Sequence, residues 1–243
     1  MRVVLLQARD VGDPMLSHEA RCFAARCELA VEQFECVNLV EGVSPRASLD
    51  AADVVMVGGS GDYSLVGELE GWRAELLDLM REIVDRKMPM FGSCFGFQAL
   101  VRAYGGTLAS DPAAAEVGKF EVTLTSDGAA DPLFAGAAPR FPVQLGHNDS
   151  ASLDLPEPLV RLAYSERAPV QAVRVRGTSV VATQFHPELA IEDNILRYLR
   201  YLQRYDPSLT EEEAQVQAQR IHRATPYANS LLRRFLQLVR SAS

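Results

Sequence analysis

Short apolar runs alternate with longer amphipathic segments through the first half of the chain. The runs have the length of buried strands and cover residues 3–6, 34–39, 53–57 and 88–91. The segments between them place apolar residues at helical spacing over residues 17–33 and 68–86, and for about ten residues after Cys94. Ser17 is expected to cap the first helix and Gly105-Gly106 to end the third. Apolar strands that alternate with helices predict an α/β fold with a parallel sheet.

From residue 107 onward the pattern changes to short strands separated by turn signals such as Arg176-Gly177. The expected strands cover residues 120–125, 141–145, 160–165, 170–175 and 179–185. We therefore predict β-rich additions to the parallel sheet. Helical patterning returns over residues 190–204, where Pro207 is expected to end it, and two amphipathic helices are expected over residues 210–223 and 227–240.

Composition narrows the class of protein. The 243 residues are 48% hydrophobic and 23% charged, which is enough apolar material for a large core and excludes wholesale disorder. The net charge of −8 makes nucleic acid an unexpected partner, because phosphate backbones repel acidic surfaces. Apolar runs are too short for a signal-peptide core or a membrane span. The expected setting is the cytoplasm, without a membrane partner and with reduced cysteines.

Cys94 stands at the sharpest local motif of the chain. An apolar strand runs into Gly92-Ser93-Cys94-Phe95-Gly96, and a helix follows. This is the arrangement of a nucleophile elbow, in which residues two positions away on each side must be small so that backbones can approach. The helix N-terminus beneath Cys94 favours its thiolate. Ser93 cannot be the nucleophile by the same rule, because the residues two positions before and after it are the large Phe91 and Phe95. The alternative is a buried structural cysteine between two packing glycines.

A thiolate that attacks an acyl carbon needs a base. His186 ends an apolar strand in Gln184-Phe185-His186-Pro187-Glu188. Glu188 lies two residues further on, where it can orient the imidazole by a hydrogen bond. Cysteine, histidine and carboxylate then form a triad in which each member positions the next. A histidine alone at a strand end would be interpreted as a surface residue, and its occurrence together with the elbow cysteine favours catalysis.

These two segments together resemble the class I glutamine amidotransferases, especially the glutaminase domain of GMP synthetase and its stand-alone relatives. The resemblance covers residues 1 to about 205 and implies a domain over residues 1–205, with a helical extension over residues 206–243 packed on it. It also implies a flavodoxin-like, mostly parallel sheet flanked by helices. The implied activity is release of ammonia from the side-chain amide of glutamine through a γ-glutamyl thioester.

The resemblance further implies a set of binding residues. The backbone amides of Gly59 and Phe95 correspond to the oxyanion hole, although the usual proline after the second glycine is Ser60 here. Gln98, Gly146 and His147 correspond to positions that bind the substrate, and His147 is expected to shape its loop rather than to react. A phosphate cradle is the alternative for the glycine loop, and it is disfavoured because the third glycine of that motif would fall on Ser64.

Two further points bear on function. His18, Cys22 and Cys27 fall roughly on one helix face and are interpreted as core residues, so no metal or organic cofactor is expected. The tail after residue 205 is too short for a nucleotide-activating synthetase. Three functions therefore stay open: a glutaminase that passes ammonia to a separate synthase partner, a γ-glutamyl peptidase or hydrolase acting on γ-glutamyl amides or peptides, and a non-catalytic regulatory or binding protein on the same fold.

Overall fold

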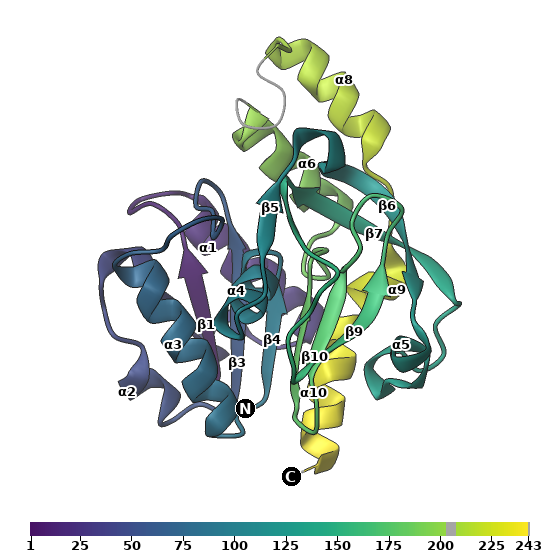
Figure 1. Ribbon diagram of the computed structural model, residues 1–243. Coiled ribbons are helices and arrows are strands. Elements are labelled where there is room, and N and C mark those ends of the chain that lie inside the picture. Colours follow the sequence, from purple (N-terminus) through teal and green to yellow (C-terminus); the bar gives the residue numbers. More distant parts are fainter. Residues whose placement is uncertain (203–207, 243) are drawn as a thin grey trace.

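A computed structural model describes residues 1–202 and 208–242 (Figure 1). Its central sheet contains, in the described residues, nine strands in the order β2-β1-β3-β4-β11-β10-β9-β6-β7. The first five are mutually parallel: β2 (Phe34–Asn38), β1 (Val3–Ala8), β3 (Val54–Ser60), β4 (Met90–Ser93) and β11 (Val180–Thr183). The next four continue the sheet in antiparallel fashion: β10 (Ala172–Val175), β9 (Leu159–Tyr164), β6 (Glu116–Leu124) and β7 (Arg140–His147). A separate pair joins β5 (Leu108–Ser110) to β8 (Asp149–Ala151).

Helices cover both faces of the parallel strands. Val4 and Leu6 of β1 pack toward α3 (Trp72–Asp85) and α4 (Phe95–Ala103). The alternate residues, Val3 and Leu5, pack in the opposite core with α1 (Met15–Cys27) and α10 (Leu231–Ala242). Successive strand residues point to opposite faces, so a strand that is apolar at every position serves two cores. The predicted α/β class, with a mostly parallel sheet, β-rich additions and C-terminal helices, is confirmed.

The remaining elements are short or peripheral. They are the helices α2 (Arg46–Leu49), α5 (Ser126–Ala130), α6 (Ile191–Arg200), α8 (Glu211–Ile221) and α9 (Pro226–Asn229), and the 3₁₀ turns η1 (Val31–Gln33), η2 (Leu39–Glu41), η3 (Pro112–Ala114) and η4 (Pro132–Phe134). A small third cluster packs α6 against α8 through Tyr198, Ala214 and Ala218. In Figure 1, α8 stands at the top of the molecule and α10 runs down behind the sheet.

Some predicted helix ends were wrong. Ser17 does not cap α1, which begins at Met15, because the Asp13 carboxylate accepts the Met15 amide and Pro14 has no N–H to satisfy. The same helix ends at Cys27, where Glu28 adopts φ = 54°. The helix expected over residues 227–240 is two helices, α9 and α10, with Ser230 between them. Pro207 and the expected domain boundary at residues 205–206 lie outside the described residues.

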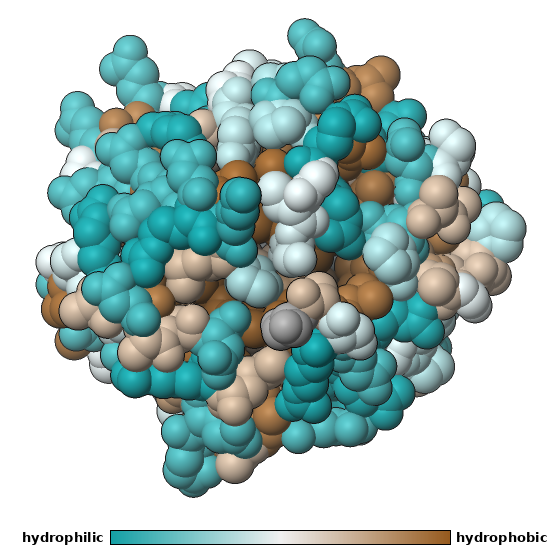
Figure 2. Space-filling view, turned by 90° about the horizontal axis from the view of Figure 1, so that it is seen from below, coloured by the Kyte–Doolittle hydropathy of each residue, from teal (hydrophilic) through white to brown (hydrophobic). Residues whose placement is uncertain are grey.

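The outer surface is mainly hydrophilic on the face seen from below in Figure 1. Figure 2 shows that face, with apolar atoms in patches between polar side chains. Among the helices in the described ranges, we find none that combines the length and apolar character needed to cross a membrane.

Candidate active site

The sheet register brings the two sequence motifs together. β11 pairs in parallel with β4, and Thr183 lies opposite Ser93 at the carboxyl end of both strands. The Cys94 amide donates to the Thr183 carbonyl oxygen at 2.8 Å. The residues that follow each strand, Cys94 on one side and His186 on the other, therefore emerge at the same edge of the sheet.

Cys94 occupies a tight turn between β4 and α4. Its φ is 49°, which is a strained backbone region for a residue other than glycine. The turn is crowded: a Cβ added to Gly96 would lie 2.6 Å from the Val57 carbonyl oxygen, and one added to Gly92 would lie 2.8 Å from the Gly96 carbonyl carbon. The predicted need for small residues on both sides of the cysteine thus has a direct steric basis.

His186 lies between Cys94 and a buried carboxylate. His186 Nδ1 hydrogen-bonds to Glu188 Oε1 at 2.8 Å, and the Cys94 side chain is close enough to interact electrostatically with the same imidazole. Ser93 Oγ donates to the second oxygen, Glu188 Oε2, at 2.8 Å. Glu188 and Ser93 are fully buried, and Cys94 and His186 are nearly so. The carboxylate is therefore fixed from two sides and holds one edge of the imidazole.

Charge distribution favours a protonated imidazole. Burial alone would lower the pKa of His186, but the negative charges of Glu188 and Cys94 outweigh it and raise this pKa to about 9. Burial would raise the pKa of Glu188, and His186, Arg197 and Ser93 together lower it to about 2. The site thus holds a charged histidine beside a charged carboxylate at neutral pH.

A chain of buried ion pairs supports Glu188. Arg197 of α6 contacts Glu188 Oε1 and Glu19 Oε1, each at 3.4 Å. Glu19 of α1 also accepts from Arg9 Nη2 at 2.9 Å. Burial would raise the pKa of Glu19, and the two guanidinium groups lower it. These ion pairs were not predicted from the sequence, although Glu19 precedes the core residue Phe23 by one helical turn and so falls on the buried face of α1.

Two glutamine side chains complete the surroundings of the thiol. Gln184 Nε2 donates to Cys94 Sγ at 3.5 Å, a contact that was not predicted although Gln184 belongs to the histidine motif. Gln98 Nε2 donates to the Asp149 carbonyl oxygen at 3.1 Å and to Gln184 Oε1 at 3.3 Å. Gln98 therefore links α4 to the first residue of β8.

The predicted substrate-binding residues line one cavity at the thiol. His147 Nδ1 hydrogen-bonds to the Asp149 carbonyl oxygen at 3.0 Å and His147 Nε2 to Glu116 Oε2 at 3.1 Å, so both ring nitrogens hold the loop. The cavity wall consists of Ser60, Gly61, Tyr63, Cys94, Phe95, Gln98, Gly146, His147, Asn148 and Asp149.

The two glycines near the carboxyl end of β3, expected in a loop, belong to the strand and leave room for neighbouring side chains. A Cβ on Gly58 would lie 2.6 Å from the Glu19 carboxyl carbon, and one on Gly59 would lie 3.2 Å from His186 Cε1. The Gly59 amide donates to Glu19 Oε1 at 3.1 Å. Phe95 occupies the first position of α4, where a helix leaves amide groups without an acceptor inside the helix. Of the two amides expected in the oxyanion hole, that of Gly59 is therefore bonded to a protein carboxylate.

Comparison with known proteins identifies a family. The model described as "Glutamine amidotransferase class-I" matches residues 9–202. A similar curated protein is the glutamine-hydrolysing GMP synthase of Corynebacterium glutamicum (strain R), which is 34% identical over 140 residues, covering 58% of this chain and 24% of that protein. The corresponding enzyme of Streptomyces avermitilis is 29% identical over 170 residues, covering 70% of this chain and 30% of that protein. The chain thus matches less than a third of the length of these relatives.

Solved structures share the fold. A glutamine amidotransferase from Thermotoga maritima superposes with a TM-score of 0.71 and 19% identity, covering 98% of this chain and 97% of that one. A glutamine amidotransferase from Methylobacillus flagellatus gives a TM-score of 0.71 and 19% identity, covering 97% of this chain and 94% of that one.

Proposed function

The chain belongs to the class I glutamine amidotransferase family, and we propose that it hydrolyses the side-chain amide of glutamine and releases ammonia. The observation that carries this proposal is the buried Cys94–His186–Glu188 set at a strained turn beside a cavity. Cys94 is the proposed nucleophile, His186 the acid and base, and Glu188 the residue that orients His186. The family's relatives named above are glutamine-hydrolysing enzymes.

Attack by sulfur is the first step of the proposed mechanism. His186 holds the proton of Cys94, and the thiolate attacks the γ-carbonyl carbon of glutamine. The Gln184 side chain stabilises the thiolate by donating to Sγ. The imidazolium then gives its proton to the departing nitrogen, which leaves as ammonia. The γ-glutamyl group stays bound to the Cys94 sulfur as a thioester. Water, deprotonated by His186, hydrolyses the thioester to glutamate and restores the thiol.

The Phe95 amide is the proposed first donor to the oxyanion, because it follows the nucleophile at the start of α4. Gly59 is the proposed second donor. Its amide now donates to Glu19, so this bond must open before the amide can turn toward the substrate. Formation of the complete oxyanion hole is thus proposed to require a local change in Gly58-Gly59-Ser60 at the end of β3.

The released ammonia is proposed to be used by a separate synthase subunit. The curated relatives are GMP synthases, of which the chain matches 24% in one case and 30% in another. The alternative activity is hydrolysis of other γ-glutamyl amides or peptides, which needs the same thioester and no acceptor.

A substrate panel with purified protein tests the proposal. Glutamine, a γ-glutamyl peptide and a γ-glutamyl anilide are offered to the wild type, to Cys94→Ala and to Cys36→Ser, which removes an exposed thiol. We expect ammonia from glutamine with the wild type and Cys36→Ser, and a loss of at least about 10³-fold with Cys94→Ala. A glutamine analogue with a diazoketone in place of the amide should also label Cys94, detected by mass spectrometry.

The outcomes of the substrate panel distinguish the three functions. Full glutamine hydrolysis by Cys94→Ala would contradict the proposed nucleophile. Turnover of γ-glutamyl peptides but not of glutamine would replace the proposed substrate by the alternative one. Absence of both turnover and labelling would favour a non-catalytic role.

A further inference from the structure

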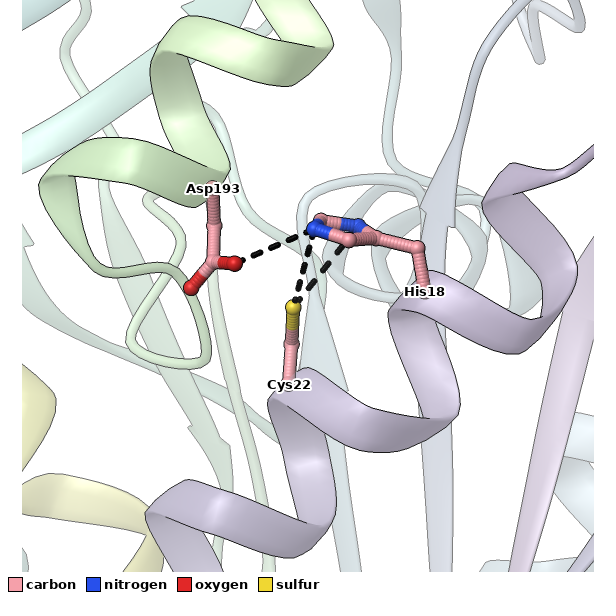
Figure 3. Close-up of side chains that lie close together, drawn as sticks. All are labelled: His18, Cys22 and Asp193. Carbon is pink, nitrogen blue, oxygen red and sulfur yellow. Dashed lines mark hydrogen bonds and ion pairs between the residues drawn. The ribbon is translucent and has the colours of Figure 1, made fainter.

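Three side chains with metal-binding atoms meet between α1 and α6, away from the cavity at Cys94. His18 and Cys22 project from successive turns of α1, and Asp193 projects toward them from the first turn of α6 (Figure 3). The imidazole, thiol and carboxylate atoms all lie within 4.8 Å of one another. His18 and Cys22 are buried, while the Asp193 side chain is 27% exposed, which leaves an approach from solvent. From the sequence, His18 and Cys22 were interpreted as core residues, and Asp193, which is remote in the chain, was not connected with them.

The separations fit a tetrahedral zinc centre. Zinc bonds of about 2.3 Å to sulfur and about 2.0–2.2 Å to nitrogen or oxygen, at tetrahedral angles, place nitrogen and sulfur ligands about 3.6 Å apart and nitrogen and oxygen ligands about 3.4 Å apart. Here Cys22 Sγ lies 3.6 Å from His18 Nε2, and His18 Nε2 lies 3.0 Å from Asp193 Oδ1. Cys22 Sγ also lies 3.7 Å from His18 Nδ1, so the imidazole would have to turn and move away from Asp193 to place a single ion between the three atoms.

The surroundings of Asp193 fit a ligand as well. Its Oδ2 accepts from the Ala190 amide at 2.9 Å, which fixes the carboxylate and leaves Oδ1 facing His18. A thiolate and a carboxylate supply two negative charges, and a neutral imidazole supplies a third ligand. Softer thiolate and imidazole ligands select zinc-like ions over magnesium or calcium.

We propose that His18, Cys22 and Asp193 form a binding site for a divalent transition metal of the zinc type, with water as the fourth ligand. When the ion binds, the Cys22 thiol releases its proton to solvent and sulfur bonds to the metal. His18 Nε2 gives up the proton that it donates to Asp193, and Nδ1 carries the proton of the neutral imidazole instead. His18 Nε2 and Asp193 Oδ1 then each bond to the ion.

Such an ion would tie α1 to α6 next to the active site. Glu19 directly follows the ligand His18, and Arg197 lies one turn after the ligand Asp193. These two neighbours already bond to each other, and Arg197 also contacts Glu188. The metal would therefore hold in place the two helices whose charged side chains support the catalytic carboxylate. This consequence alone rests on the proposed function, whereas the metal site does not.

Cobalt(II) titration tests the site, because a cobalt–thiolate bond absorbs in the near ultraviolet. The full chain carries Cys36→Ser and Cys94→Ala, so that neither the exposed nor the active-site thiol binds metal. We expect one equivalent of cobalt with thiolate absorption and displacement of the cobalt by zinc. Cys22→Ala and Asp193→Asn should each weaken binding by at least about 100-fold. Cys27→Ala is the matched control, since Cys27 is also buried on α1 but contacts Met56.

Far-ultraviolet circular dichroism and melting in a chelator show whether each variant folds. Asp193→Asn keeps the test valid if Cys22→Ala does not fold, because Asp193 is partly exposed. Cobalt binding without thiolate absorption, no binding at all, unchanged binding in Asp193→Asn, or equal loss in Cys27→Ala would each overturn the proposed site.

Discussion

Replacing Glu188 by glutamine removes the negative charge next to His186 while preserving the shape of the residue 188 side chain. In the wild type, Glu188 is the first of the groups that raise the pKa of His186 to about 9. The difference from the ordinary value of about 6.5 corresponds to about 3 kcal/mol in favour of the imidazolium. In Glu188→Gln, burial still lowers this pKa and Cys94 still raises it, so we expect the pKa to fall toward 6.5.

The reactivity of Cys94 reports this change without knowledge of the substrate. Iodoacetamide alkylates the thiolate, and the imidazolium of His186 stabilises that form. Burial raises the pKa of Cys27 to about 12 and raises that of Cys22 as well, so these thiols react slowly. The exposed Cys36 is replaced by serine in both proteins so that only Cys94 is followed. At pH 7.5, a pKa of about 9 leaves nearly all His186 side chains protonated, whereas a pKa near 6.5 leaves only about a tenth of them protonated. Alkylation should therefore be about 10-fold slower in Glu188→Gln than in the wild type.

The pH dependence of the free energy of unfolding is the second measurement. A histidine whose pKa is higher in the folded than in the unfolded state stabilises the fold fully below pH 6.5, and this contribution is lost as the pH rises through about 9. The wild type should therefore lose about 3 kcal/mol of this contribution between pH 6 and pH 9.5, and Glu188→Gln should not. Equal alkylation rates at pH 7.5, or the same pH dependence of urea unfolding in both proteins, would refute the assigned role of Glu188.

Three further predictions concern stability and are read from urea unfolding. Arg197→Met leaves Glu188 and Glu19 without a shared partner and should lower the free energy of unfolding by about 3–5 kcal/mol. The control Arg200→Met, at an exposed position, should lower it by less than about 1 kcal/mol. Equal losses in the two variants would contradict the buried network. Gly96→Ala forces a methyl group against the Val57 carbonyl and should cost about 1–3 kcal/mol, so an unchanged midpoint would disprove the crowding. Phe235→Ala removes a buried ring of α10 whose centroid lies 5.5 Å from that of Phe91 and should cost about 3–5 kcal/mol, and a neutral result would show that α10 contributes little to the core.

Local chemistry made the two motifs predictable. A nucleophile at a strand-to-helix turn needs small neighbours, and Gly92 and Gly96 meet a backbone that leaves no room for a Cβ. A histidine just after an apolar strand must emerge at the carboxyl end of the sheet. The sequence could not indicate that β11 pairs with β4, because α4, α5 and six further strands lie between the two strands in the chain. That pairing alone places His186 beside Cys94.

Residues that act through distant partners were not predictable. Glu19 and Arg197 lie on helices far apart in the sequence, and each is a charge on a buried helix face that would be costly without its partner. The start of α1 was missed for a more local reason. Both Asp13 and Ser17 can cap a helix, and Pro14 decides between them because it has no amide hydrogen and favours the first turn. Residue preferences alone do not rank two caps four positions apart.

Glu19 also connects Gly59, near the end of β3, to the triad, and this contact sets an energetic condition for the proposed oxyanion hole. The Gly59 amide bonds to Glu19, a charged acceptor, and such a bond contributes about 1.5–3 kcal/mol. The developing oxyanion is a charged acceptor as well, so exchanging one for the other changes the free energy little. Glu19 would keep Arg9 and Arg197 as partners after the exchange and would not become an unpaired buried charge. In the proposed mechanism, substrate binding or a partner protein therefore has to supply only a small bias to turn the Gly59 amide toward the reacting carbonyl.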